Sequence, residues 1–267
     1  MRAVALASGK GGSGKTTLAI HLAEGLRRQG RRVLMVDLDP TGHATAWLLG
    51  MAGATGQGAA EALLNDQLTD AHLRQVEGRP GLDLLPATGA LQKVEGRLAS
   101  EPGSDLIFRT LLRDAGERWD FVVIDTPPTL GALTLNALCA AEGVLAPVLP
   151  GVLALGGLRH LEGTLATLRR RYGEGEVARS LGYALFAADA RKNLTDEARE
   201  LLHREAPGRL LKAEVRVSTA AEVLPLRRET AWDEGADPRG AEDYPAVLRE
   251  VLQRLDAGGP RFRKVKG

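Results

Sequence analysis

The stretch Gly-Lys-Gly-Gly-Ser-Gly-Lys-Thr-Thr at positions 9–17 determines how the rest of this 267-residue chain is interpreted. It matches the pattern G-x-x-x-x-G-K-[ST] of a phosphate-binding loop in full. In such a loop Lys15 reaches the β- and γ-oxygens of a nucleotide, and the Thr16 hydroxyl is a ligand of Mg²⁺. Lys10 adds a second positive charge that the minimal pattern does not need. The backbone N–H groups that cradle the phosphates belong to Gly11, Gly12, Ser13 and Gly14.

The segments on either side of this loop support the interpretation. Residues 3–7 are a short apolar run, as expected of a buried strand. Residues 17–28 place apolar side chains at the spacing of a helix with one inward face, and Gly30 follows as a helix-ending glycine. The pattern requires a strand, the loop and a helix in this order, because the helix N-terminus adds partial positive charge to the phosphate site. The alternative is a glycine-rich turn that binds no ligand.

Strand-like and helix-like segments alternate along the chain, and 44% of its residues are hydrophobic, enough to bury a core. The predicted strands cover residues 3–7, 32–37, 82–86, 121–125, 143–148, 181–186 and 212–217. The predicted helices cover residues 17–28, 59–64, about 130 onward, 153–171, 194–203 and 245–255. This alternation predicts an α/β fold, a single-domain P-loop NTPase with a twisted, mostly parallel sheet and helices on both faces. We expect the domain to span residues 1–257 and residues 258–267 to be a basic, disordered tail.

Charge and cysteine content narrow the class of protein further. The net charge is +1, so a nucleic-acid surface has to be a local patch. Cys139 is the only cysteine, which excludes an internal disulfide and suits a reducing cytoplasm, and its apolar helical surroundings indicate a core position. The chain starts directly with a strand and has no apolar run long enough to cross a membrane, so we expect a cytoplasmic protein without a membrane partner.

Acidic residues follow two of the predicted strands. Asp125 ends the most apolar strand, which is the Walker B position, where the aspartate of a P-loop NTPase helps to hold Mg²⁺. Asp37 and Asp39 follow the second strand, and alternation at a strand end points both the same way. One could act on the metal shell and the other on the attacking water. The plainer alternatives are an acid that caps the next turn and a solvated turn.

Together these motifs resemble the ParA family of deviant Walker A ATPases. The loop at 10–17, Asp-Leu-Asp-Pro at 37–40 and Asp-Thr-Pro-Pro at 125–128 occur in the family's order and at its spacing. Weaker similarity extends over most of the chain, including residues 85–88 and 133–138. The resemblance implies a homodimer with ATP sandwiched between its subunits, with Mg²⁺ as the second cofactor. It also implies slow hydrolysis stimulated by a ParB-like partner, and segregation or positioning of plasmid or chromosomal DNA.

The resemblance further implies a role for each residue of the site. Lys10 matches the signature lysine that reaches across the dimer to the partner's phosphates. Lys15 would be the P-loop lysine, with Thr16 on Mg²⁺ and Thr17 near the α-phosphate. Asp39 would position the hydrolytic water, while the Walker B aspartate lies in the outer metal shell. From the residues alone, the extra lysine is an ordinary solvated side chain.

The sequence departs from the family pattern at two places. Thr41 and His43 stand where family members usually have Gln and Asn, which leaves the contacts around the water and the dimer face open. Residues 216–218 read Arg-Val-Ser where the family often has a Pro-Arg-Asn adenine contact. The residues that recognise the base are therefore not assigned.

ParA proteins bind double-stranded DNA non-specifically as ATP dimers, through scattered arginine and lysine side chains. The candidates in this chain are Arg191, Lys192, Arg227 and Arg228. Their contacts would be to phosphates, and hence salt-sensitive and independent of sequence. The protein would then be associated with the nucleoid in its ATP-bound state. Ordinary surface charge is the alternative for each of these residues.

Relatives of the ParA family bind membranes or carry iron–sulfur clusters, and other P-loop proteins are metabolic enzymes. MinD-type relatives bind membranes through an amphipathic C-terminal helix, but the tail here has only Phe262 and Val265 as apolar residues, too few for such a face. A single cysteine excludes the iron–sulfur arrangement of the nitrogenase iron-protein type. The main alternative to DNA segregation is a nucleotide-dependent positioning or regulatory ATPase for a non-DNA cargo. A metabolic P-loop kinase or ligase is a weaker one, because no acceptor-substrate motif is evident.

Overall fold

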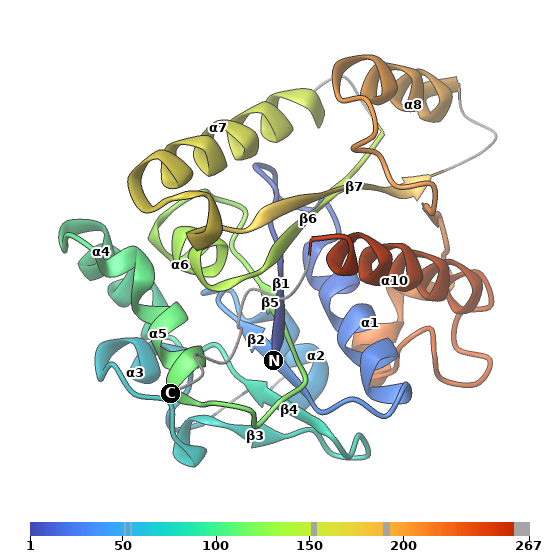
Figure 1. The fold of residues 1–267 in the computed structure, drawn as a ribbon. Coiled ribbons are helices and arrows are strands. Elements are labelled where there is room, and N and C mark those ends of the chain that lie inside the picture. The colour runs from blue at the N-terminus through green and yellow to red at the C-terminus, as the bar shows by residue number, and fades with distance from the viewer. Residues whose placement is uncertain (51, 54, 151–153, 189–192, 259–267) are drawn as a thin grey trace.

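Eight strands form one sheet in the order β3-β4-β2-β5-β1-β6-β7-β8 (Figure 1). The structure, a computed structural model, describes residues 1–50, 52–53, 55–150, 154–188 and 193–258. Neighbouring strands run parallel, with the exception of β3, which pairs antiparallel with β4. The predicted α/β class with a mostly parallel sheet is therefore confirmed.

The helices and strands alternate along the chain. The strands are β1 (Arg2–Leu6), β2 (Val33–Asp37), β3 (Arg74–Gln75), β4 (Leu82–Leu85), β5 (Phe121–Asp125), β6 (Gly143–Val148), β7 (Arg179–Ala188) and β8 (Val215–Arg216). The helices are α1 (Lys15–Arg28), α2 (His43–Leu49), α3 (Ala59–Leu64), α4 (Leu91–Ser100), α5 (Ile107–Asp114), α6 (Ala132–Ala140), α7 (Ala154–Tyr172), α8 (Asn193–Glu205), α9 (Leu224–Arg227) and α10 (Gly240–Asp256).

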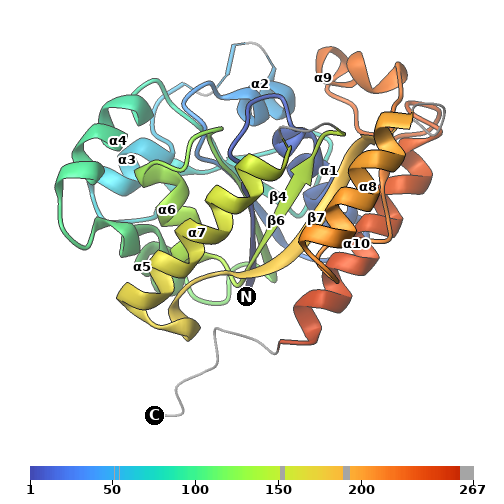
Figure 2. The same cartoon turned by 90° about the horizontal axis from the view of Figure 1, so that it is seen from above.

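Helices cover both faces of the sheet (Figure 2). Side chains alternate along the central strand β1, so Ala3 and Ala5 belong to the core on one face and Val4 and Leu6 to the core on the other. The first core is completed by apolar side chains of α3 to α8, and the second by those of α1, α2 and α10. Cys139 is buried in the first core, as predicted.

The structure also differs from the sequence-based expectation in several elements. Helices α2, α4, α5 and α9 and the two-residue strand β3 were not predicted, and β8 is shorter than the expected strand at 212–217. Strand β3 and the short helices α2 and α9 carry too few residues to show a periodicity of their own. Helices α4 and α5 do carry apolar residues at helical spacing, such as Leu91, Val94 and Leu98 in α4, so these two helices could have been predicted from the sequence. Helix α10 begins five residues before the predicted start and contains Pro245. The tail at 258–267 lies outside the described residues apart from Gly258, so its disorder stays a prediction.

The order of the strands brings the two sequence motifs to one edge of the sheet. Strand β1 lies beside β5, with Leu6 opposite Asp125, and β5 lies beside β2, with Asp125 opposite Asp37. The phosphate-binding loop follows β1 at this edge. In open α/β sheets, ligands bind at the carboxyl ends of the strands. The fold therefore places the loop and both acidic strand ends around one site.

A buried histidine ties α1 to the C-terminal part of the chain. His21 is fully buried, and its Nδ1 lies 2.6 Å from the carbonyl oxygen of Thr17, so Nδ1 carries the proton. Its Nε2 accepts a hydrogen bond of 3.0 Å from the backbone N–H of Ala231. The imidazole ring stacks on Tyr244 of α10 with the ring centroids 3.8 Å apart. Burial lowers the pKa of His21 to about 4.

This histidine predicts a pH-dependent part of the stability. Its pKa is depressed from 6.5 to about 4 on folding, so below pH 6.5 the unfolded chain binds a proton that the folded protein does not. The stabilisation is complete above pH 6.5 and is lost as the pH falls towards 4, by about 3 kcal/mol in total. Urea unfolding at pH 7.5 and pH 5 should show a smaller pH effect in His21→Phe than in the parent. Equal pH effects in the two proteins would contradict this assignment.

Candidate nucleotide site

The loop between β1 and α1 has the geometry that phosphate binding needs. Gly12 and Gly14 have φ values of +70° and +92°, a region that favours glycine. A Cβ atom at Gly14 would also lie 2.5 Å from the ring of Phe186, at the end of β7, so this position admits no side chain. The hydroxyls of Ser8 and Ser13 lie 2.6 Å apart and join the two ends of the loop.

The two lysines of the loop have different environments. Lys15 opens α1 and is only 6% exposed. Burial lowers its pKa below the usual value, and the negative charges of Asp125 and Asp39 act in the opposite direction. Lys10 is exposed, and across the described ranges its side chain forms no hydrogen bond or ion pair. Lys15 is therefore placed among the acids of the site, and Lys10 faces outwards.

Thr16 and Asp125 form the candidate metal site. The Thr16 hydroxyl donates a hydrogen bond of 2.6 Å to Oδ2 of Asp125. Oδ1 of Asp125 is buried and has no partner among the described residues. Burial, followed by the charge of Asp37, raises the pKa of Asp125 well above its usual range. A buried, unpartnered carboxylate oxygen beside a threonine hydroxyl fits a hydrated Mg²⁺, which prefers oxygen ligands and keeps several waters.

The two acids at the end of β2, Asp37 and Asp39, have different hydrogen-bond partners. Asp37 is fully buried, and its Oδ2 accepts hydrogen bonds from the backbone N–H and the hydroxyl of Thr45, at 2.8 and 2.7 Å. Asp37 thereby caps the first turn of α2, and burial raises its pKa to about 6. Asp39 lies beyond the strand, and its Oδ1 accepts hydrogen bonds from the backbone N–H and hydroxyl of Thr41. Of the two, Asp37 has the capping role, and Asp39, which is 6% exposed, is held by Thr41 in the loop that follows β2.

The residues that depart from the family pattern take part in this acidic loop. The Thr41 hydroxyl donates to Oδ1 of Asp39 at 2.7 Å, so the 3.2 Å contact between the same hydroxyl and Nδ1 of His43 requires the imidazole to donate. Arg216 pairs with Asp243 and Glu242 of α10, at 2.8 and 2.7 Å. Thr41 thus holds Asp39 directly, His43 contacts only the Thr41 hydroxyl, and Arg216 is engaged away from the loop.

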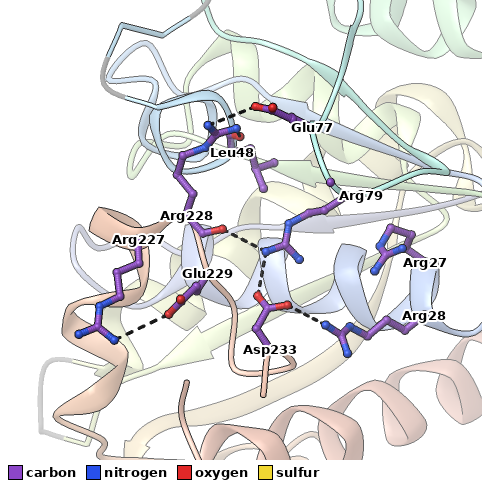
Figure 3. Close-up of a pocket in the computed structure, with 10 residues that line it drawn as sticks. Arg27, Arg28, Leu48, Glu77, Arg79, Arg227, Arg228, Glu229 and Asp233 are labelled. Carbon is purple, nitrogen blue, oxygen red and sulfur yellow. Dashed lines mark hydrogen bonds and ion pairs between the residues drawn. The ribbon is translucent and has the colours of Figure 1, made fainter. Parts of the chain in front are cut away.

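Two of the four predicted DNA contacts lie in the described part of the chain, and Arg191 and Lys192 lie outside it. Arg227 and Arg228 line a cavity of about 480 Å³ between the end of α1, the turn before β4 and the segment after α9 (Figure 3). Arg27, Arg28 and Arg79 form its floor, and all three pair with the buried Glu24. Arg227 and Arg228 have only loose ion pairs, at 4.0 Å with Glu229 and 3.7 Å with Glu77.

Three residues near the site were not found from the sequence. Ser8 joins the loop ends, Phe186 packs on Gly14, and Trp47 of α2 donates to the backbone carbonyl of Glu229 at 2.8 Å. The position of Ser8 directly before the glycine-rich pattern was a usable signal. The contacts of Phe186 and Trp47 join segments more than 170 residues apart, and neither residue belongs to a motif.

These features define a P-loop nucleotide-binding protein with a Walker B aspartate. A family profile described as an AAA domain matches residues 1–175. The chromosome-partitioning ATPase Soj of Thermus thermophilus is 36% identical over 256 residues, covering 96% of this chain and 97% of that protein. The chromosome partitioning protein ParA of Myxococcus xanthus is 34% identical over 263 residues, covering 98% and 92%. The chain belongs to the ParA family of deviant Walker A ATPases.

Solved structures agree on the fold. Cobyrinic acid a,c-diamide synthase from Mycobacterium smegmatis, with a bound ATP analog and magnesium, superposes with a TM-score of 0.82 at 28% identity over 97% of each chain. The apo form of McdA from Cyanothece gives a TM-score of 0.84 at 20% identity, covering 96% of this chain and 99% of that one. In the part of the chain that is described, there is no helix both long and apolar enough to span a bilayer.

The Thr16–Asp125 pair predicts that a change at Asp125 weakens Mg²⁺ binding. Asp125→Asn keeps the shape of the side chain but removes the charge, and we expect the Mg²⁺ affinity of the ATP complex to fall about 10- to 100-fold. Mg²⁺ titration of ATP binding measures it. Asp120→Asn is the matched control, because Asp120 lies next to the other end of β5 and pairs with Arg32. The same Mg²⁺ dependence in Asp125→Asn and the control would reject the metal site.

Proposed function

We propose that this protein is an ATP-dependent dimerising switch ATPase that binds DNA non-specifically and drives segregation or positioning of plasmid or chromosomal DNA. The observation that carries the proposal is the Thr16–Asp125 hydrogen bond of 2.6 Å beside the buried Lys15, at the edge of the sheet where the loop begins. The similarity to Soj and ParA over nearly the whole chain supports the same conclusion.

The residues suggest how hydrolysis of ATP to ADP and phosphate proceeds. Phosphoryl transfer depends mainly on positioning and charge stabilisation. Lys15 supplies positive charge to the β- and γ-phosphates, Thr17 contacts the α-phosphate, and Thr16 and Asp125 would hold Mg²⁺, which neutralises charge when bound. Asp39 accepts a hydrogen bond from the attacking water and holds it in line with the γ-phosphate. Thr41 keeps the Asp39 carboxylate oriented through two hydrogen bonds, at 2.9 and 2.7 Å.

Dimerisation is assigned to Lys10. Its exposed side chain is free of partners among the described residues, which leaves the ammonium available to phosphates held by a second subunit. Lys15 neutralises the phosphates within one subunit, and Lys10 would do so across the interface. ATP between two subunits would therefore join them, and hydrolysis, stimulated by a ParB-like protein, would release them.

Opposite changes in assembly should follow from two substitutions. Lys10→Ala should bind ATP but stay monomeric, because it loses the charge that crosses the interface, whereas Asp39→Ala should accumulate as an ATP dimer that releases no phosphate. Analytical ultracentrifugation with ATP and Mg²⁺ measures both. Lys93→Ala is the matched control, an exposed lysine on α4, and Lys15→Ala should lose nucleotide binding. A Lys10→Ala dimer, or normal hydrolysis in Asp39→Ala, would refute the assigned roles.

DNA binding is assigned to arginines of the ATP dimer, with Arg227 and Arg228 as the described candidates. A surface of this kind contacts phosphates, and the logarithm of the affinity falls with the logarithm of salt concentration by about 0.9 per contact. The protein would be cytoplasmic, and associated with the nucleoid while ATP is bound. The alternative is a positioning ATPase with a non-DNA cargo.

Charge reversal distinguishes these two functions. Arg227→Glu should abolish ATP-dependent retention of random-sequence DNA while basal ATP hydrolysis stays intact, because Arg227 lies away from the loop. Arg228→Glu should also lose DNA retention, but Arg228 lines the cavity beside Thr16 and Thr17, so its ATP hydrolysis is measured separately. Arg113→Glu, on the exposed surface of α5, is the control and should retain DNA binding. Fluorescence anisotropy at several salt concentrations measures the effect. If the parent protein itself retains no DNA with ATP, the non-DNA alternative is favoured.

A further inference from the structure

The segment after α9 is fastened to the short helix α2. Arg228 Nη2 donates a hydrogen bond of 3.0 Å to the backbone carbonyl of Leu48, and Trp47 Nε1 donates one of 2.8 Å to the backbone carbonyl of Glu229. The two bonds run in opposite directions between neighbouring residues. They join parts of the chain that are 180 and 182 residues apart in sequence. The backbone around Arg228 therefore moves with α2.

The other end of α2 is fastened to the acidic loop of the nucleotide site. Oδ1 of Asp37 accepts from the backbone N–H of Asp39 at 3.1 Å, and Oδ2 accepts from the backbone N–H of Thr45 at 2.8 Å. One carboxylate thus holds both the start of the Asp39 loop and the first turn of α2. Because α2 has only seven residues, Thr45 and Leu48 lie within one turn of each other. The hydrogen bonds of Asp37 therefore connect the Asp39 loop to the helix whose other end contacts Arg228.

Arg228 is half-buried and uses one of its N–H groups within the protein. Its guanidinium is committed to the Leu48 carbonyl and turned towards Glu77 at the wall of the cavity (Figure 3). Its backbone has φ +56°, the left-handed region that non-glycine residues adopt at a cost. The neighbouring Arg227, by contrast, has a side chain that is 64% exposed. The Nη2 hydrogen that the Leu48 carbonyl accepts is not available to a phosphate while this bond is made, and the Arg228 side chain is 38% exposed.

The contact between α2 and α9 has room to rearrange. A cavity of about 380 Å³ lies between them and the first turn of α1, where Thr16 and Thr17 line it. Helix α9 has only four residues, and Leu226 on it is 79% exposed. Closely packed cores resist small displacements, but a helix bordered by a cavity does not meet that resistance. The free space lies on the nucleotide side of the contact.

We propose that α2 is a latch on Arg228. In the arrangement described here, the Leu48 carbonyl and the Trp47 indole hold Arg228 and its backbone against α2. ATP at the Asp39 loop displaces α2 and releases the arginine for phosphate contact. The latch rests on the proposed function and adds the route by which the nucleotide site controls the arginine pair. Trp47 and Asp37 are positioning residues in it, and neither touches the reacting atoms.

The test compares two tryptophan substitutions. Trp47→Phe keeps a ring in the buried position and removes the hydrogen bond to Glu229. Trp119→Phe is the matched control, because Trp119 is also buried and its Nε1 also makes a 2.8 Å bond, to Asp83. The affinity for random-sequence duplex is measured by anisotropy with and without ATP. Coupling between sites is typically about 5- to 150-fold. We expect Trp47→Phe to bind DNA more tightly than the parent in the absence of nucleotide. The ratio of the DNA affinities with and without ATP should therefore be at least about fivefold smaller than in the parent. The control should show the same ratio as the parent.

Hydrogen exchange of the parent protein provides a readout without DNA or substitution. The backbone N–H groups of Arg228, Glu229 and Ala231 are all hydrogen-bonded, so their exchange reports on this segment. A non-hydrolysable ATP analogue should accelerate their exchange, and Trp47→Phe should be fast already without nucleotide.

An unchanged ATP effect on DNA affinity in Trp47→Phe would overturn the latch and leave the proposed function standing. Absence of ATP-dependent DNA binding in the parent would count against the proposed function. The exchange measurement then tests the latch by itself. If the nucleotide leaves the exchange rates of these three amides unchanged, the latch is overturned.

Discussion

The hydrogen bond between the Thr16 hydroxyl and the Asp125 carboxylate depends on a constraint that organises the whole structure. The strands that lead to these residues, β1 and β5, are adjacent, parallel and in register at their carboxyl ends. The sheet order brings β2 to the other side of β5, so the acidic loop reaches the same edge. Helices on both faces bury the sheet and hold this register. The relative positions of the glycine-rich loop, Asp125 and the Asp39 loop are thus set by strand order.

The fold and the centre of the site could be predicted from local patterns. The glycine-rich loop has a steric requirement at each position, and the positive φ values of Gly12 and Gly14 meet it. In the same way, an apolar strand that ends in an acid predicted that Asp125 would lie beside the loop, where it accepts a hydrogen bond from the Thr16 hydroxyl. Both signals lie within a few consecutive residues. Each is compatible with few backbone conformations. A single sequence carries that kind of information well.

The division of roles around β2 could not be predicted, because it depends on partners from elsewhere in the chain. Asp37 and Asp39 have the same chemistry and lie two positions apart, and they differ in their partners, which are Thr45 for Asp37 and Thr41 for Asp39. The same limit applies to Arg228, which sequence suggested as a DNA contact and which the structure places against the end of α2. The hydrogen-bond partner of Arg228 lies 180 residues away in the sequence, so local sequence does not identify it.

The placement of the three tryptophans has a practical consequence. Trp47 lies on α2, Trp232 donates to the backbone carbonyl of His21 on α1, and Trp119 donates to Asp83 on another part of the sheet. The His21 and Trp47 rings meet edge to face, with their centroids 5.8 Å apart. The protein therefore carries two native fluorophores in contact with His21 and a third bonded to β4. Its conformational kinetics can be followed by stopped-flow emission without attaching a dye.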